Sequence, residues 1–155
     1  MPGARWVSPE NLHLTLRFIG EVHNGQAQDI DSTLMKVRAP KLEIQLDGVG
    51  LFGKAGAARI LWAGVRKSEA LTRLHGKVES ALRDAGISPD ERKFSPHVTL
   101  ARLRNAPASR VQRFVAENAH FATESLPVDH FVLYSSHRST SGAIYTAEAD
   151  YALGA

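Results

Sequence analysis

Two short segments of the chain repeat one pattern of chemically active side chains. His13 and Thr15 lie in LHLTLRFIG, and His97 and Thr99 lie in PHVTLARLR, so each segment reads His, apolar, Thr, apolar. In a β-strand, residues two apart point to the same side. Each segment is therefore predicted to present an imidazole beside a hydroxyl, while the leucine or valine between them points into a core.

These paired motifs suit cleavage of a phosphodiester without a metal. A neutral imidazole can accept a proton from an attacking water, and a protonated imidazole can give one to the leaving oxygen. An unperturbed histidine pKa of about 6.5 allows both states near neutral pH. The threonine hydroxyls can donate hydrogen bonds to the non-bridging oxygens. Two histidines with no Cys, third His or carboxylate in register form a poor ligand set, so we expect no metal and no cofactor.

By strand alternation, one arginine is a candidate for binding the phosphate: Arg17 is in step with His13 and Thr15. Arg102 is out of step with Thr99, and it reaches the same side only if the strand bulges, twists or ends there. The formal charge of +3, with arginine as the main cation, suits a phosphate partner. The sequence lacks the dense positive runs typical of proteins that coat duplex DNA.

The elements that must position these motifs alternate between strand and helix patterns. Each motif is followed by a helix and two strands, so the chain reads as two copies of one supersecondary unit. Without strict βαβ alternation, this order predicts an α+β fold with mostly antiparallel sheet. The glycine-rich DGVGLFGKAGAAR is predicted to be a loop or bulged turn. The predicted strands are 12–19, 42–46, 60–65, 97–103, 130–135 and 143–149, and the predicted helices are 26–39, 68–86 and 108–119.

Length and composition bound the class of protein. With 155 residues and 43% hydrophobic content, the chain fits one domain with a real core. No apolar run approaches the roughly 20 residues that cross a bilayer, and MPGARWVSPE lacks the apolar stretch of a signal peptide. The absence of cysteine excludes disulfides and thiolate metal sites. We expect a cytoplasmic protein.

The segments RWVSPENLHLTLRFIGEV and FSPHVTLAR resemble the signature segments of the two-histidine (2H) phosphoesterases. They are most similar to the bacterial and archaeal RNA 2′,3′-cyclic phosphodiesterases, also called 2′–5′ RNA ligases. GVGLFGKAGAARILWAGV and FVLYSSHRSTSGAIYTAEADYAL resemble the same group, so nearly the whole chain is covered. The resemblance implies a single domain over residues 1–155. Its fold would be bilobal and pseudo-two-fold, with two mostly antiparallel sheets flanked by helices around a central cleft.

Family members begin with a further strand and helix before the RWV segment. Here that segment begins at Arg5, close to the first residue of the sequence. Either the native start lies upstream of Met1, or one lobe lacks this strand and helix. A missing strand would leave one sheet edge open.

The resemblance also implies the reaction and the roles of the site residues. The family hydrolyses a 2′,3′-cyclic phosphate to a 2′-phosphate without a metal. His13 would be the proton donor towards the 3′ oxygen, and His97 would accept a proton from water. Thr15 and Thr99 would hold the phosphate, and Arg102 would bind the phosphate or its nucleotide. The implied substrates are cyclic nucleotides and RNA ends or tRNA fragments with a 2′,3′-cyclic phosphate, with 2′–5′ ligation as the reverse reaction. No membrane and no obligate protein partner are implied.

Other functions remain open at this stage. The chain could be a non-catalytic module that binds RNA ends, although intact histidines and threonines in both motifs favour an enzyme. A 2H enzyme could also act on ADP-ribose 1″,2″-cyclic phosphate or on 2′–5′ oligoadenylate. Phe52, Trp62 and Phe94 are candidates for stacking on a base.

Overall fold

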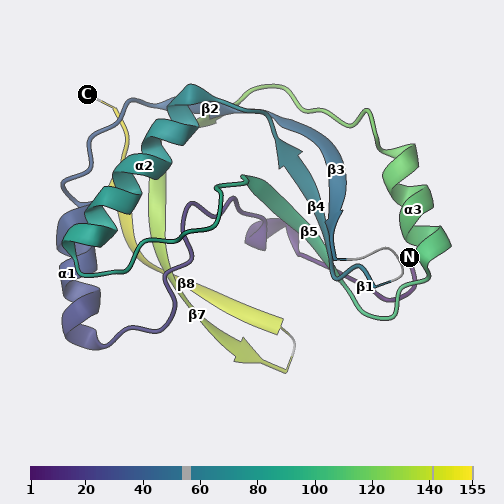
Figure 1. The fold of residues 1–155 in the computed structure, drawn as a ribbon, viewed down its shortest axis with the longest axis horizontal. Coiled ribbons are helices and arrows are strands. Elements are labelled where there is room, and N and C mark those ends of the chain that lie inside the picture. Colours follow the sequence, from purple (N-terminus) through teal and green to yellow (C-terminus); the bar gives the residue numbers. More distant parts are fainter. Residues whose placement is uncertain (54–56, 141, 155) are drawn as a thin grey trace. The chain divides into compact units, whose positions relative to one another are not determined.

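A computed structural model describes residues 1–53, 57–140 and 142–154. The helices and antiparallel strand pairs of this part confirm the predicted α+β class (Figure 1). The helices are α1 (Asn24–Leu34), α2 (Glu69–Asp84), α3 (Ala108–Glu117) and the 3-10 helix η1 (Pro9–Asn11). The strands are β1 (Ala4–Trp6), β2 (Leu42–Ile44), β3 (Leu46–Phe52), β4 (Ile60–Val65), β5 (His97–Leu103), β6 (Leu126–Val128), β7 (His130–Ser139) and β8 (Gly142–Ala152).

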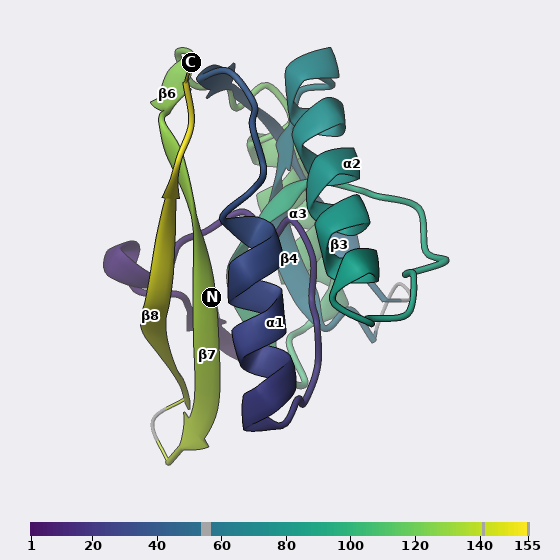
Figure 2. The same cartoon turned by 90° about the vertical axis from the view of Figure 1, so that its left-hand side faces the viewer.

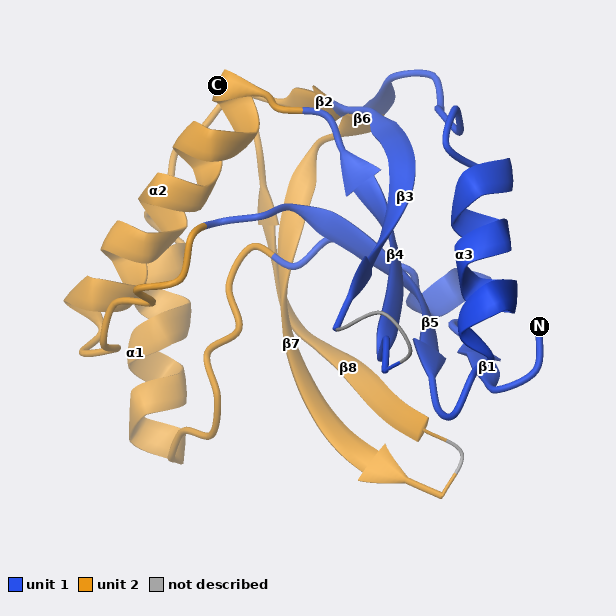
Figure 3. Ribbon diagram, turned by 45° about the vertical axis from the view of Figure 1, so that its right-hand side comes forward, with its two compact units in different colours: residues 1–15, 44–66, 94–126 blue, residues 16–43, 67–93, 127–155 orange. Residues whose placement is uncertain are grey.

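The chain divides into two compact units, each assembled from three separate segments (Figure 3). Unit 1 comprises residues 1–15, 44–66 and 94–126. Unit 2 comprises residues 16–43, 67–93 and 127–155. Both His-x-Thr motifs lie in unit 1. The chain passes into unit 2 directly after Thr15, the last residue of the first motif's His-Thr pair. The expectation of one domain with two similar lobes stays a prediction.

Unit 1 is a four-stranded sheet with one face covered by a helix. The strand order is β1-β5-β4-β3, and each neighbouring pair is antiparallel. Apolar residues of β4 and β5 pack against α3, which runs along that face (Figure 1). Trp6 adds a ring contact with Phe114 of α3, at 5.6 Å between centroids. This core consists of Leu61, Ala101, Leu103 and Val111. Because α3 covers only one face, the side chains of the other face are available for chemistry.

Unit 2 contains α1, α2 and the β7–β8 hairpin (Figure 2). Helix α2 follows its predicted pattern. The Ser68 hydroxyl accepts a hydrogen bond from the backbone N–H of Leu71 at the start, and Gly86 follows the end with a φ of 87°. Its buried stripe comprises Leu71, Leu74, Val78, Ala81 and Leu82. In α1, the buried residues are Ile30 and Leu34. Within the described residues, no helix is long and apolar enough to cross a membrane.

The order of elements confirms the predicted repeat and extends it. The first motif is followed by α1, β2, β3 and β4, and the second by α3, β6, β7 and β8. In both copies, one residue separates a short strand from a long one: Gln45 in the first copy and Asp129 in the second. The two short strands, β2 and β6, pair with each other.

Two predicted elements are wrong. The strand predicted at 12–19 is reduced to one bridge residue, Leu14, because the chain enters unit 2 after Thr15. The glycine-rich segment is not a loop in its first part, because residues 46–52 form β3. Residues 54–56 of that segment lie outside the described residues. Strand β7 also continues four residues beyond its predicted end, and β8 continues three residues beyond its predicted end.

Candidate active site

The two His-x-Thr motifs lie side by side on the sheet of unit 1. Leu14 forms an antiparallel bridge with Val98 of β5. In this register each histidine stands opposite the threonine of the other motif: His13 faces Thr99, and His97 faces Thr15. Val98 is buried on the side that α3 covers, so the four polar side chains belong to the other side. The two histidines are then diagonal neighbours about 7 to 8 Å apart, which leaves space for a phosphoryl group.

Each histidine is oriented by its own chain two residues upstream. The Nδ1–H of His13 donates to the carbonyl oxygen of Asn11 at 2.7 Å, and that of His97 donates to the carbonyl oxygen of Ser95, also at 2.7 Å. A carbonyl oxygen can only accept a hydrogen bond, so Nδ1 carries the proton in both neutral rings. The Nε2 atoms therefore accept a proton when the rings are neutral and donate one when they are charged, as acid-base catalysis requires.

A β-bulge brings Arg102 to the same face as the motifs. Thr99 pairs with Trp62 of β4, but Ala101 pairs with Leu61, so Leu100 is an extra residue in β5. Ala101 is fully buried on the α3 side, and its neighbour Arg102 therefore points to the motif side. Strict alternation from the motif would point Arg102 to the α3 side. The structure contains the bulge that Arg102 needs to reach the side of the motifs.

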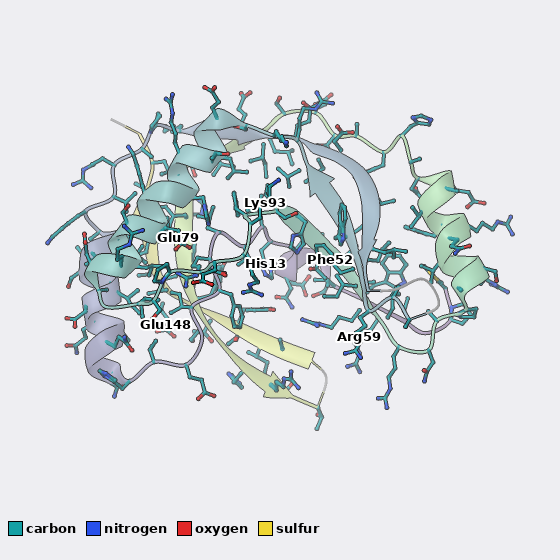
Figure 4. The ribbon with its side chains drawn as sticks, viewed as in Figure 1. His13, Phe52, Arg59, Glu79, Lys93 and Glu148 are labelled. Carbon is teal, nitrogen blue, oxygen red and sulfur yellow. The ribbon has the colours of Figure 1, made fainter. Side chains whose placement is uncertain are left out.

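Aromatic side chains pack against one histidine. Phe52 lies at the end of β3 (Figure 4). Its ring lies edge-on to His97, with 4.9 Å between ring centroids. Trp62 lies 5.4 Å from Phe52 and 6.3 Å from His97. Its indole also covers Gly50, where an added Cβ would stand 2.3 Å from Cζ2 of the ring. Its Nε1–H is buried and has no acceptor among the described residues. Both aromatic residues thus pack around a motif histidine, and their stacking on a base stays a prediction.

The structure places Arg17 in an ion-pair network of unit 2, so strand alternation does not carry it to the side of His13 and Thr15, and its role in binding the phosphate stays a prediction. Its guanidinium is 3.2 Å from Glu79 and 3.7 Å from Asp90, and it donates to the carbonyl oxygen of Ser88 at 2.7 Å. Only 8% of the Arg17 side chain is exposed. The alternation fails because residues after Thr15 leave the sheet. Buried beside two carboxylates, Arg17 neutralises charge within its own unit.

Sequence reasoning missed three contributors to the site. Two of them are the backbone carbonyl groups of Asn11 and Ser95. Any residue type supplies such a group, so the sequence does not reveal them, although both residues precede a motif histidine by two positions. Gly50 lies in the segment that the sequence predicts to be a loop or bulged turn. Its actual role is to let Trp62 lie close to β3. No group of three or more His, Asp or Glu side chains that could hold a metal ion occurs within the described residues.

Comparison with known proteins identifies the family. The family model of LigT-like phosphoesterases matches residues 1–62 and 64–145. The chain belongs to this family. The RNA 2′,3′-cyclic phosphodiesterase of Aeropyrum pernix is 37% identical over 143 residues, which are 90% of this chain and 80% of the relative. The enzyme of the same name from Thermotoga maritima is 35% identical over 145 residues, covering 92% of this chain and 76% of the relative. These matches confirm the resemblance seen in the motifs.

Solved LigT structures share the fold. LigT of E. coli in its apo form superposes with a TM-score of 0.77 at 28% identity, covering all of this chain and 84% of that one. The same protein complexed with 3′-AMP gives a TM-score of 0.74 at 28% identity, covering 97% of this chain and 82% of that one.

The contact between Trp62 and Gly50 predicts a specific loss of stability. We expect Gly50→Ala to lower the free energy of unfolding by about 1 to 3 kcal/mol, because its Cβ would force the indole out of place. Gly76→Ala is the control: it lies within α2 with no atom within 4 Å of the new Cβ. There we expect a gain of about 0.5 to 1 kcal/mol. Urea unfolding measures both changes, and a shift of the same sign in both variants would contradict the proposed contact.

The network around Arg17 predicts a dependence of stability on pH. Burial lowers the pKa of His75 below its ordinary value of 6.5; the Glu79 carboxylate opposes this effect, and Arg17 reinforces it. At His75, the unfolded chain then binds a proton more readily than the folded chain. The contribution of neutral His75 to stability is therefore complete above pH 6.5 and is lost as the pH falls below 6.5. In urea titrations between pH 5 and 6.5, we expect His75→Gln to flatten the slope, by less than the roughly 1.4 kcal/mol per pH unit of one full proton.

His130 provides the control of opposite sign for this measurement. Its hydrogen bond to the Asp129 carboxylate raises the pKa of His130 above 6.5. Its contribution is complete below pH 6.5 and lost as the pH rises above that value. His130→Gln should therefore change the slope only above pH 6.5. An unchanged slope below pH 6.5 in His75→Gln would contradict the assignment to His75.

Proposed function

We propose that this chain hydrolyses the 2′,3′-cyclic phosphate at the 3′ end of RNA to a 2′-phosphate, by acid-base catalysis without a metal. The observation that carries the proposal is the Leu14–Val98 bridge, whose register sets two imidazoles diagonally across one patch with a threonine opposite each. The names of the relatives support the substrate, since the proteins of Aeropyrum pernix and Thermotoga maritima are RNA 2′,3′-cyclic phosphodiesterases.

In the proposed reaction, water attacks the phosphorus in line with the bond to the 3′ oxygen. Nε2 of His97 accepts the proton of the water as the new P–O bond forms. Nε2 of protonated His13 gives its proton to the 3′ oxygen as the P–O3′ bond breaks. The products are a 2′-phosphate and a 3′ hydroxyl, and the two histidines end with their protonation states exchanged. This assignment of acid and base follows the family resemblance.

The remaining polar groups of the face bind the phosphates of the substrate. The hydroxyls of Thr15 and Thr99 donate to the non-bridging oxygens, where charge increases in the transition state. Arg102 contributes a cation for the phosphates of the substrate. The reverse reaction uses the same groups and joins two RNA ends through a 2′–5′ bond. Excess water makes this the minor reaction. An RNA substrate and a sequence without cysteine support a cytoplasmic location.

The same groups could cleave other phosphodiesters. ADP-ribose 1″,2″-cyclic phosphate presents a comparable ester, and 2′–5′ oligoadenylate offers a related phosphodiester. A structure of LigT complexed with NADP+ adds a relative that holds a dinucleotide. Comparing kcat/KM among these substrates and an RNA end ranks them directly, and the proposal requires the RNA end to rank first.

The mechanism predicts that both histidines are essential. We expect His13→Ala and His97→Ala each to lower kcat/KM for a cyclic-phosphate RNA end by at least about 100-fold, because each removes one proton-transfer group. His120→Ala is the matched control, since His120 is exposed in unit 1 and follows α3. The control should retain activity. A loss of only a few-fold in either motif variant would remove the basis of the mechanism.

The mechanism also predicts the product and the response to chelation. Hydrolysis should continue unchanged in EDTA, because imidazoles and hydroxyls supply all the chemistry. Only the 2′-phosphate should form, since the proton is delivered to the 3′ oxygen. Chromatography that separates 2′- from 3′-phosphates measures this. Binding of the 2′-nucleotide by a folded protein without turnover would instead favour a module that binds RNA ends.

A further inference from the structure

Two arginines stand directly opposite each other beside the proposed site. Arg5 of β1 pairs in register with Arg102 of β5. Directly opposed residues of antiparallel strands point to the same face. Their neighbours in register, Ala4 with Leu103 and Trp6 with Ala101, belong to the α3 side. Both arginine side chains therefore point to the face of the motifs. Like charges in this position repel each other and destabilise the sheet.

Among the described residues, no carboxylate neutralises either of these arginines. Within the described residues, Arg5 and Arg102 form no ion pair and no side-chain hydrogen bond, and both residues are exposed. Several other arginines of the chain do pair with acidic residues: Arg17, Arg66, Arg73, Arg92 and Arg113. Two opposed guanidinium groups without acidic partners form a site of concentrated positive charge. An anion bound between them would turn the repulsion into attraction.

The pair lies further along β5 than the reacting groups. Thr99 pairs with Trp62 and Arg102 pairs with Ile60, two residues further along β4, so Arg102 lies roughly 7 Å beyond Thr99 along the sheet. These side chains can therefore reach a second phosphate of the substrate besides the one that the threonines hold. In an RNA whose terminal cyclic phosphate lies between the histidines, the next anionic group is the phosphodiester on the 5′ side of the terminal nucleotide.

We propose that Arg5 and Arg102 together bind this second phosphodiester, so that the site selects RNA ends over cyclic mononucleotides. The inference rests on the proposed function. It assigns a binding role to Arg5, and it assigns Arg102 to the neighbouring phosphate instead of the reacting one. Guanidinium forks match phosphate oxygens in bidentate geometry, which suits a site that recognises a backbone phosphate independently of the base.

The test compares a cyclic mononucleotide with a dinucleotide that ends in the same cyclic phosphate. The unmodified protein should have the higher kcat/KM for the dinucleotide. Arg5→Gln and Arg102→Gln should each lower kcat/KM for the dinucleotide by roughly 10- to 100-fold, the range for a charge-assisted hydrogen bond. The mononucleotide should change by less than about 3-fold. Arg110→Gln, on α3 and exposed, makes the same charge change on the opposite side of the sheet and should leave both values unchanged.

A dinucleotide with an uncharged methylphosphonate linkage separates charge from stacking. In the unmodified protein it should behave like the mononucleotide, and in the double variant the charged and uncharged dinucleotides should react equally. Equal loss on all three substrates would place the arginines at the reacting phosphate and overturn the inference, as would no loss on any of them. Equal turnover of mononucleotide and dinucleotide by the unmodified protein would overturn it while the proposed function stands.

If no substrate turns over, the proposed function fails, and binding still decides the inference. The probes are then the 2′-phosphate mononucleotide and the 2′-phosphate dinucleotide. Tighter binding of the dinucleotide, lost in Arg5→Gln, supports the second phosphate site. Equal dissociation constants for the two probes would overturn it.

Discussion

The antiparallel bridge between Leu14 and Val98 is the contact on which the site depends. Side chains alternate along strands with a period of two, so a slip of one residue would turn His13 and Thr15 towards the α3 side. Burial of Val98 in the core opposes such a slip, because the shifted register would bring polar groups into contact with apolar ones. The position of the motif side chains is thus fixed by the packing of the residues between them.

The bulge at Leu100 is the second constraint, and it changes what β5 can display. Without it, a strand has one alternation for its whole length, and a cation at position 102 would face the core. With one extra residue, His97 and Thr99 at one end share a face with Arg102 at the other. The apolar residues Ala101 and Leu103 still pack on α3. One inserted residue therefore reconciles a continuous core with a continuous polar face.

Much of the fold was predictable from local pattern. The bounds of β4 and β5 follow their alternation, and α2 has both its cap and its apolar stripe, because these features depend on neighbouring residues. The segment 12–19 shows where local pattern fails. Its alternation is as regular as that of β5, but its second half belongs to another unit, and a tertiary ion pair of Arg17 with Glu79 takes precedence.

The His and Thr side chains of the candidate site are visible in the sequence, and the groups that support them are not. A repeated His-x-Thr is visible in the sequence because each histidine and threonine bears its chemistry in its side chain. Backbone carbonyls, an absent side chain at Gly50 and the pairing of Arg5 with Arg102 leave no comparable pattern. They depend on which strands become neighbours, and β1 is too short to be recognised by alternation. The sequence therefore predicts individual strands and reactive side chains, but not the features that depend on which strands pair.

The carbonyl groups that orient the histidines have a consequence for the electrostatics of the site. Many catalytic histidines are oriented by an aspartate, which adds a full negative charge and stabilises the imidazolium. Here the main chain fixes the tautomer with a neutral dipole. The site can therefore hold both rings in place without adding a negative charge beside an anionic substrate. An enzyme that must approach a phosphate with two histidines gains from orienting them with peptide groups.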